Sequence, residues 1–170
     1  DYDTVLVGAG VYYELINFMG KDITVKSESG SSETWLDGAN NGTVVTFNQG
    51  ETTDAVLKEF TIRNGYGYGG TQLKGGAITI SDGSSPVIEG CIIINNQGYR
   101  GGAITISGSG SNPIIRHNII AHNDADVDGG AIYIGTDAQP TLLNNLMHTN
   151  AAGYGGAVFA KECPIGRANV

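Results

Sequence analysis

The sequence predicts an all-β fold, a single-stranded parallel β-helix of about six coils. The first observation behind this prediction is a Gly-Gly-Ala-Ile motif, Gly-Gly-Ala-Val in its last copy, that recurs after 26, 28 and 26 residues. The second is a proline-led apolar segment between the copies of the motif. A period of this length is typical of a solenoid in which each repeat forms one coil. The motif copies start at Gly75, Gly101, Gly129 and Gly155, and the segments start at Pro86, Pro113 and Pro140.

The motif itself predicts a strand. In GGAITIS, residues 75–81, apolar residues alternate with small or polar ones, so Ile78 and Ile80 lie on one face and Thr79 on the other. Strands that recur at the same place in successive coils pair in parallel, and we expect their aliphatic rows to fill the core. Apolar stretches in residues 1–54 predict the first and least regular coils, and segment 65–74 predicts a long loop. The length fits one domain over residues 1–170.

Asparagines recur at fixed places in the proline-led segment. Stacked amides can hydrogen-bond from coil to coil and satisfy buried carbonyl groups, so we interpret these asparagines as structural ladders. Cys91 and Cys163 belong to different coils, too far apart for a disulfide, and Cys91 stands at an inward, apolar position. The repeated asparagines are Asn118 and Asn145 near the middle of the segment and Asn96, Asn123 and Asn150 at its end.

Composition excludes several classes of protein. With 17 acidic and 9 basic side chains the net charge is −8, so no basic stripe is available to bind a nucleic acid. No apolar run is long enough for a membrane-spanning helix, and the chain does not open on a signal peptide.

Residues 164–170 match 113–119 at proline, isoleucine, arginine and asparagine. We therefore expect the chain to stop partway through a coil.

These repeats, together with the opening DTVLVGAGVYYE at residues 3–14, resemble the right-handed parallel β-helix proteins of the pectate-lyase-like superfamily. The resemblance covers nearly the whole chain. It implies a right-handed coil and an extracellular, cell-surface or periplasmic location. The superfamily contains lyases, glycoside hydrolases, epimerases and adhesins, so the resemblance implies no single activity, and no catalytic motif of its enzymes is matched residue by residue.

One outward row of the repeated strands is a candidate carbohydrate-binding strip. It consists of Thr79, Thr105, Tyr133 and Phe159 at equivalent positions of four copies. A flat face that carries hydroxyl and aromatic groups can stack on sugar rings. The alternative is a row of ordinary solvent-facing strand residues.

Alternating aspartates suggest a metal site. Asp124, Asp126 and Asp128 precede Gly129, as at the start of a calcium loop, although Gly135 stands where a bidentate glutamate belongs. We expect no required cofactor, and calcium is the one ion the pattern favours. The alternative is an acidic turn in which Asp128 pairs with Arg100 one coil below.

A lyase would need a base, for which Arg100, Lys74 and Arg116 are the candidates. The three histidines occupy different offsets in the repeat and form no row.

A further set of outward residues predicts self-association. If Ile93, Ile120 and Met147 point inward, a group of large aliphatic side chains points outward. So many on one exterior face exceed what a soluble monomer usually exposes, so we expect a second copy to cover them. These residues are Ile92, Ile94, Ile114, Ile119 and Leu146, joined by Val87.

Three functions remain open on the sequence. The first is a non-catalytic secreted or surface scaffold that binds carbohydrate, which the aromatic strip and the unmatched catalytic motifs favour. The second is a polysaccharide lyase or glycoside hydrolase, which the acidic segment favours. The third is a self-assembly or adhesion module, which the aliphatic face favours.

Overall fold

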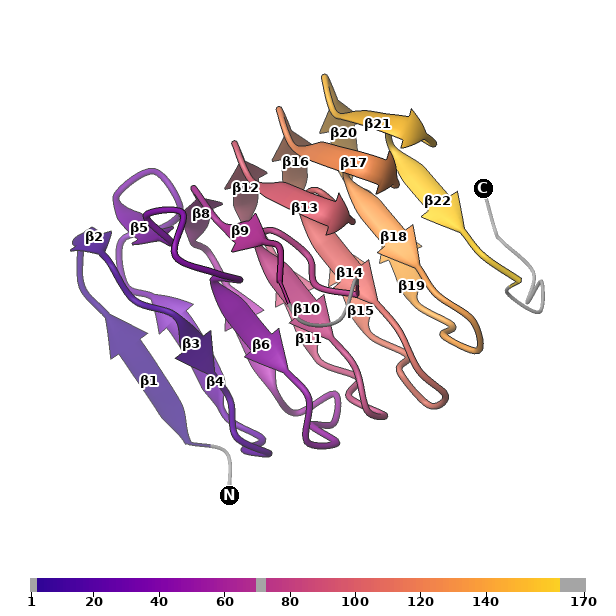
Figure 1. Cartoon of the computed structure of the whole chain (residues 1–170). Coiled ribbons are helices and arrows are strands. Elements are labelled where there is room, and N and C mark those ends of the chain that lie inside the picture. The colour runs from indigo at the N-terminus through magenta and orange to yellow at the C-terminus, as the bar shows by residue number, and fades with distance from the viewer. Residues whose placement is uncertain (1–2, 70–72, 163–170) are drawn as a thin grey trace.

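The chain winds into a parallel β-helix whose strands stack into four sheets (Figure 1). The computed structural model describes residues 3–69 and 73–162. Sheet A contains β1 (Thr4–Val7), β4 (Thr24–Ser27), β7 (Val56–Lys58), β11 (Val87–Glu89), β15 (Ile114–Arg116) and β19 (Thr141–Leu143). Sheet B contains β2 (Gly10–Tyr12), β5 (Thr34–Asp37), β8 (Thr61–Arg63), β12 (Ile92–Ile94), β16 (Ile119–Ala121) and β20 (Leu146–His148). Sheet C contains β3 (Ile16–Asn17), β6 (Val45–Phe47), β10 (Ile78–Ile80), β14 (Ile104–Ile106), β18 (Ile132–Ile134) and β22 (Val158–Ala160). Sheet D contains β9 (Tyr66–Gly67), β13 (Gln97–Arg100), β17 (Asp124–Asp128) and β21 (Ala151–Tyr154).

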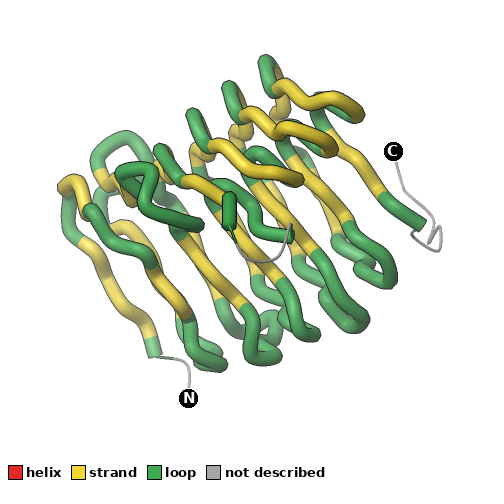
Figure 2. The backbone as a smooth tube through the Cα atoms, in the orientation of Figure 1, coloured by secondary structure: helices red, strands yellow, loops and turns green. Residues whose placement is uncertain are grey.

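The order of the sheets along the chain defines the coil. From β7 onward each coil runs through sheets A, B, D and C, whereas the first two coils have no strand in sheet D. Figure 2 shows strands and loops only, with the long loops at the edge where sheet C returns to sheet A. Six strands in each of sheets A, B and C confirm the predicted coil number, and the missing sheet D strands explain why residues 1–54 look less regular.

The predicted inward rows form the core. In sheet B, Ile62 pairs with Ile93 and Ile93 with Ile120, and all three are fully buried. In sheet C, Ile78 pairs with Ile104 in the same way. A buried aliphatic side chain of this size contributes about 1.5–3 kcal/mol relative to an exposed one. The stacked rows are therefore the main source of cohesion between coils.

The glycine pair of each motif is required by close packing between coils. A Cβ atom on Gly76 would collide with the carbonyl oxygen of Gly102, and one on Gly102 would collide with that of Gly130. The first glycine of the pair adopts a left-handed conformation in three of the copies, with φ of +68° at Gly101 and Gly129 and +62° at Gly155. Only glycine fits both positions without strain, so the motif recurs because the turn touches the next coil.

The asparagine ladders are confirmed. The amide Nδ2 of Asn96 donates to Oδ1 of Asn123 at 2.9 Å, and Nδ2 of Asn123 donates to Oδ1 of Asn150 at 3.0 Å. Asn118 donates to Asn145 at 3.0 Å in the second ladder. Each amide also binds a strand carbonyl, as Asn123 binds Ile93 at 2.9 Å. These side chains satisfy buried backbone groups at the corners of the coils.

The cysteine prediction is confirmed for one residue. Cys91 is a buried free thiol whose backbone N–H donates to Oδ1 of Asn118 at 2.9 Å. Burial raises the pKa of Cys91 from 9.0 to about 12, so the thiol stays protonated. Cys163 and the C-terminal segment that matches the middle of a coil lie outside the described residues.

Candidate functional site

The predicted outward row of sheet C exists and is longer than expected. Thr79 pairs with Thr105, Thr105 with Tyr133, and Tyr133 with Phe159. In the other direction the row continues through Thr46 to Asn17 of the first coils. Sequence reasoning missed these two residues because β3 and β6 carry no copy of the glycine motif.

Three of the four residues predicted for the strip are buried, so the prediction of an open strip is wrong. Thr105 is fully buried, Tyr133 is 2% exposed and Thr79 is 7% exposed. The hydroxyl of Thr105 donates to the carbonyl of Arg100 at 2.6 Å, because the turn that leaves sheet D folds back over the next strand. The guanidinium of Arg100 lies 5.4 Å from the ring centre of Tyr133. Strand alternation gives the side of a residue but does not show which segment lies over it.

Tyr133 and Phe159 are packed against each other. Their rings stack with centres 6.0 Å apart and planes 6° from parallel, and Phe159 is half-buried. Sugar binding by these two residues stays a prediction. Of the four residues in the predicted strip, Thr79 is the one that lines a cleft.

This cleft lies over the N-terminal half of sheet C and has a volume of about 630 Å³. It is open there because the first two coils have no sheet D strand to cover β3 and β6. Two polar rows form its floor. The first row is Asn17, Thr46 and Thr79, and the second, directly after the ends of β6, β10 and β14, is Asn48, Ser81 and Ser107.

Two loops border the floor. Leu15 and residues 41–43 line the cleft, as do Leu73 and Lys74 at the end of the predicted loop 65–74. The hydroxyl of Thr43 donates to the carbonyl of Gly75 at 2.8 Å, which joins the two loops. Asp82 lines the cleft beyond the end of β10. The cleft thus combines amide and hydroxyl groups with one cation and one carboxylate.

The aspartate segment forms strand β17, so the prediction of a turn is wrong. Asp126 accepts a hydrogen bond from the hydroxyl of Tyr68 at 2.8 Å, and burial together with this carboxylate raises the pKa of Tyr68. Asp128 pairs in register with Arg100, as predicted, and its Oδ2 lies 2.9 Å from Nε of Arg100. That contact is ionic and too poorly aligned for a hydrogen bond.

Calcium binding by Asp124, Asp126 and Asp128 stays a prediction. Within residues 3–69 and 73–162, no three histidine, cysteine, aspartate or glutamate side chains gather as a metal site would require. In β17 the side chains of Asp124 and Asp126 are exposed, whereas Asp128 is buried against Arg100. Further oxygen ligands would have to come from elsewhere.

The candidate bases differ in their surroundings. Arg100 is paired with Asp128, and Nη2 of Arg116 lies 3.0 Å from Oε2 of Glu89. Lys74 lines the cleft and has no ion pair among the described residues. Of the three candidates, Lys74 is therefore the one placed to meet a ligand in the cleft.

Two histidines meet despite their different offsets. The rings of His122 and His148 lie edge to face with centres 5.8 Å apart. His148 is the last residue of β20, and His122 follows the end of β16 at the corner. The offset argument missed this contact because adjacent rows can touch at a corner of the coil.

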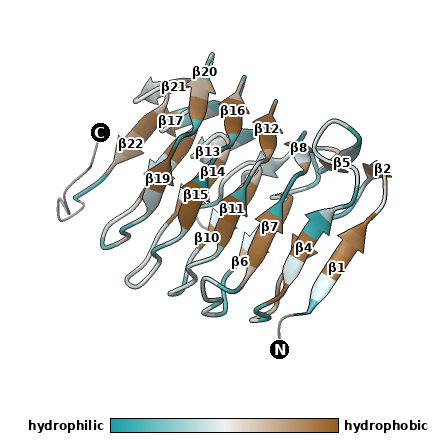
Figure 3. Cartoon of the chain, turned by 180° about the vertical axis from the view of Figure 1, so that it is seen from behind, coloured by the Kyte–Doolittle hydropathy of each residue, from teal (hydrophilic) through white to brown (hydrophobic). Residues whose placement is uncertain are grey.

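The predicted aliphatic face is real but divided. Ile93 and Ile120 point inward, as expected, while Ile119 is 39% exposed and Leu146 is 56% exposed. Ile92 and Ile94 lie half-buried on the same outer side of sheet B. Figure 3 shows sheets A and B next to each other on this side of the molecule.

Ile114 and Val87 belong to sheet A instead, so the prediction that they join the face is wrong. A charged row of sheet A, in which Lys58 pairs with Glu89 and Glu89 with Arg116, lies between them and sheet B. This row occupies the last position of β7, β11 and β15, next to the corner that leads to sheet B. From β7 to β15 this charged row separates the apolar surface of sheet B from sheet A, whereas Leu6 of β1 and Leu143 of β19 expose apolar side chains on sheet A itself.

Two buried carboxylates were not found from the sequence. Burial raises the pKa of Asp37, but hydrogen bonds from Ala39, Asn64 and Arg63 outweigh it, so that the pKa is lowered. The pKa of Glu51 is lowered in the same way, because hydrogen bonds from Ser84 and from backbone N–H groups outweigh the effect of burial. Each carboxylate ties neighbouring coils together at a turn, and neither lines the cleft.

The comparisons with known proteins give the family. A model described as "Right handed beta helix region" matches residues 19–164, which is most of the chain. Comparison with curated proteins and with solved structures gives no significant match. No helix in the described part of the chain could cross a membrane. The match and the stacked parallel strands together show that this chain belongs to the right-handed β-helix family.

Proposed function

We propose that the protein is a non-catalytic, secreted or surface-located β-helix scaffold that binds polysaccharide in the cleft over sheet C. The observation that carries the proposal is the floor of the cleft, where two polar rows run along the axis of the coil. Amide and hydroxyl groups donate and accept hydrogen bonds, as recognition of sugar hydroxyls requires. The extracellular location rests on the resemblance to secreted β-helix proteins.

The spacing of the floor supports a polymeric ligand. Neighbouring strands of a sheet lie about 4.8 Å apart, so a polar side chain returns at this interval along Asn17, Thr46 and Thr79. An extended glycan also presents the same hydroxyl groups at each sugar unit. A repeating surface of this kind favours a repeating ligand over a single small molecule.

Gel retardation against neutral and acidic polysaccharides tests the proposal. We expect retardation of the wild type and weaker retardation of a variant that carries Asn17→Ala and Asn48→Ala. Each lost hydrogen bond costs about 0.5–1.5 kcal/mol, so the affinity should fall about tenfold. Gln97→Ala, an exposed change on sheet D, is the matched control. Equal retardation of all three proteins would reject the cleft as the binding site.

A polysaccharide lyase or hydrolase is the main alternative. Lys74 in the cleft is the candidate base with no partner among the described residues, so Lys74→Ala should abolish any cleavage and leave binding by Asn17 and Asn48 in place. The length of the polysaccharide chains is measured in the same gels. Shortened chains with the wild type, and intact chains with Lys74→Ala, would establish an enzyme.

Self-association through sheet B is a second candidate function. Beyond the β8 strand, the outward residues of sheet B are aliphatic up to His148, whereas the neighbouring row of sheet A is charged from Lys58 to Arg116. A two-fold axis in the interface plane, parallel to the strands and level with the middle of the six-stranded sheet, would bring Val11 of one copy against Leu146 of the other and Trp35 against Ile119. Flat sheets pack face to face in this manner.

The mass in solution tests this association. We expect a dimer for the wild type and a monomer for Ile119→Lys, which would bury a charge in the interface. Lys58→Ala on sheet A, one row away, is the control and should remain dimeric. A wild-type monomer at all concentrations used for the binding experiment would remove self-association and leave the cleft proposal unaffected.

A further inference from the structure

The chain contains two Asn-Gly pairs, Asn41-Gly42 and Asn64-Gly65. This dipeptide has a characteristic chemistry, because glycine has no side chain to hinder attack of its own amide nitrogen on the preceding asparagine side chain. The reaction needs a free asparagine carboxamide and a free glycine N–H. Hydrogen bonds to either group therefore suppress it. The two pairs differ sharply in this respect.

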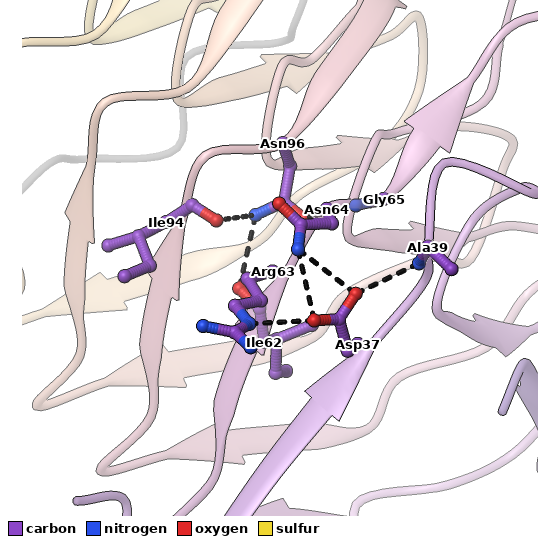
Figure 4. A network of polar contacts seen from close by, with 8 residues as sticks. All are labelled: Asp37, Ala39, Ile62, Arg63, Asn64, Gly65, Ile94 and Asn96. Atoms are coloured by element: carbon purple, nitrogen blue, oxygen red, sulfur yellow. Dashed lines mark hydrogen bonds and ion pairs between the residues drawn. The ribbon is translucent and has the colours of Figure 1, made fainter. Parts of the chain in front are cut away.

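Asn64-Gly65 is held at both reacting groups (Figure 4). The carboxamide Nδ2 of Asn64 donates to both carboxylate oxygens of Asp37 at 3.0 Å. The N–H of Gly65 donates to Oδ1 of Asn96 at 2.8 Å, inside the asparagine ladder. The site is also crowded, since a Cβ atom on Gly65 would collide with the carbonyl of Gly76. Ring closure here would require loss of three hydrogen bonds, two of them to a charged group.

Asn41-Gly42 has neither restraint. Asn41 is exposed, and within the described residues neither its carboxamide nor the N–H of Gly42 forms a hydrogen bond. The flanking backbone is nevertheless fixed, because the N–H of Asn41 donates to Gly38 at 2.8 Å and the carbonyl of Gly42 accepts from Tyr66 at 2.9 Å. The reacting groups are thus free on a well-defined turn.

We propose that Asn41 is a site of spontaneous deamidation in the folded protein and that Asn64 is protected. The amide nitrogen of Gly42 loses its proton and attacks Cγ of Asn41, so that a nitrogen–carbon bond forms and a five-membered imide results. The bond from Cγ to Nδ2 breaks, and the nitrogen leaves as ammonia after it takes up a proton. Water then adds to one of the two imide carbonyls and opens the ring to aspartate or isoaspartate. No oxidant or reductant takes part.

The product would change the cleft. Asn41, Gly42 and Thr43 line the cleft together with Lys74, which precedes the Gly75 carbonyl that Thr43 binds. Conversion of Asn41 replaces a neutral amide by a carboxylate, and the isoaspartate product also lengthens the backbone at this point. If the cleft binds polysaccharide as proposed above, the converted protein should bind acidic chains more weakly than fresh protein does.

Peptide mapping of the folded protein tests the proposal without any ligand. The protein is kept at mildly alkaline pH, where amide deprotonation is faster, and the acid and amide forms of both peptides are separated by mass. We expect conversion at Asn41 to be at least about tenfold faster than at Asn64, because breaking a hydrogen bond to a charged group slows ring closure. Protein unfolded in urea is the reference, in which both pairs should react at similar rates.

Two variants sharpen the test. Gly42→Ala should slow conversion at Asn41, since a side chain hinders the attacking nitrogen, and should leave Asn64 unchanged. Asp37→Asn removes the charge that holds Asn64 and should speed conversion there alone. Equal rates at the two sites in the folded wild type would overturn the proposal, as would an Asn41 that stays intact while the unfolded reference is converted. Because the experiment contains no polysaccharide, either result would reject deamidation at Asn41 without bearing on polysaccharide binding.

Discussion

The replacement of Asn123 by alanine tests the ladder most directly. Nδ2 of Asn123 donates to Ile93, Ala121 and Asn150 at 2.9, 3.0 and 3.0 Å. Its Oδ1 accepts the backbone N–H of Asn96 at 3.0 Å and the side-chain amide of Asn96 at 2.9 Å. One side chain therefore joins three coils, and it is 1% exposed.

The cost of this change follows from its contacts. The buried N–H of Asn96 loses its partner, which costs about 1–3 kcal/mol, and the other bonds contribute about 0.5–1.5 kcal/mol each. Bonds that share partners do not add fully, so we expect the free energy of unfolding to fall by about 3–5 kcal/mol. Domains of this kind have about 5–15 kcal/mol in total. The variant should therefore unfold at a much lower urea concentration.

Urea denaturation measures the change, followed by circular dichroism and by fluorescence of Trp35, the single tryptophan. Asn95→Gly is the matched control, because Asn95 is exposed and has a φ of 56° that glycine adopts without strain. The control should change stability by less than about 0.5 kcal/mol. If Asn123→Ala costs no more than the control, the ladder does not stabilise the fold and the reasoning fails.

Three further predictions concern stability and reactivity. Hydrogen bonds hold the pKa of Glu51 below its ordinary 4.5 despite burial. The ionised Glu51 therefore stabilises the fold fully above pH 4.5, and this contribution is lost as the pH falls through the lower pKa of the folded state. Glu51→Gln should make stability depend less on pH in this acidic range. Gly102→Ala should lower stability by more than about 2 kcal/mol through collision with the next coil, whereas Gly8→Ala, with nothing within 4 Å, should be neutral in the same melts. Alkylation of Cys91 should require unfolding, because burial raises its pKa to about 12; rapid modification in the native protein, detected by peptide mapping, would contradict this.

Much of the fold could be predicted because each repeat has the same pattern of apolar residues, asparagines and glycines. The alternation around Ile78 and Ile80 gives the inward rows, and the recurrence of Asn96 and Asn123 gives the ladder. The Gly-Gly pair marks a close approach of two coils. These features are local and periodic, so a single sequence contains them in full.

The candidate site was less predictable. Thr79 and Thr105 occupy equivalent positions, yet one lines the cleft and the other is fully buried under the turn of the motif. Asn17 and Thr46 complete the floor from coils that lack the motif. Asn17 and Thr46 belong to the two coils without a sheet D strand, so the opening of the cleft depends on whole coils and cannot be read from a single row.

The direction of the asparagine ladder bears on how this chain can change in length during evolution. Every rung donates toward the next coil, and the partners in both ladders are 27 residues apart. Duplication of one whole coil would therefore give the new asparagine a donor below and an acceptor above, and no existing contact would need to be redesigned. A duplication that is not a whole number of coils would put a different residue into an asparagine slot, since His122 and Asp124 flank Asn123. The ladder thus makes the coil the natural unit of gain and loss, and it can preserve the register of a solenoid while the outer loops diverge.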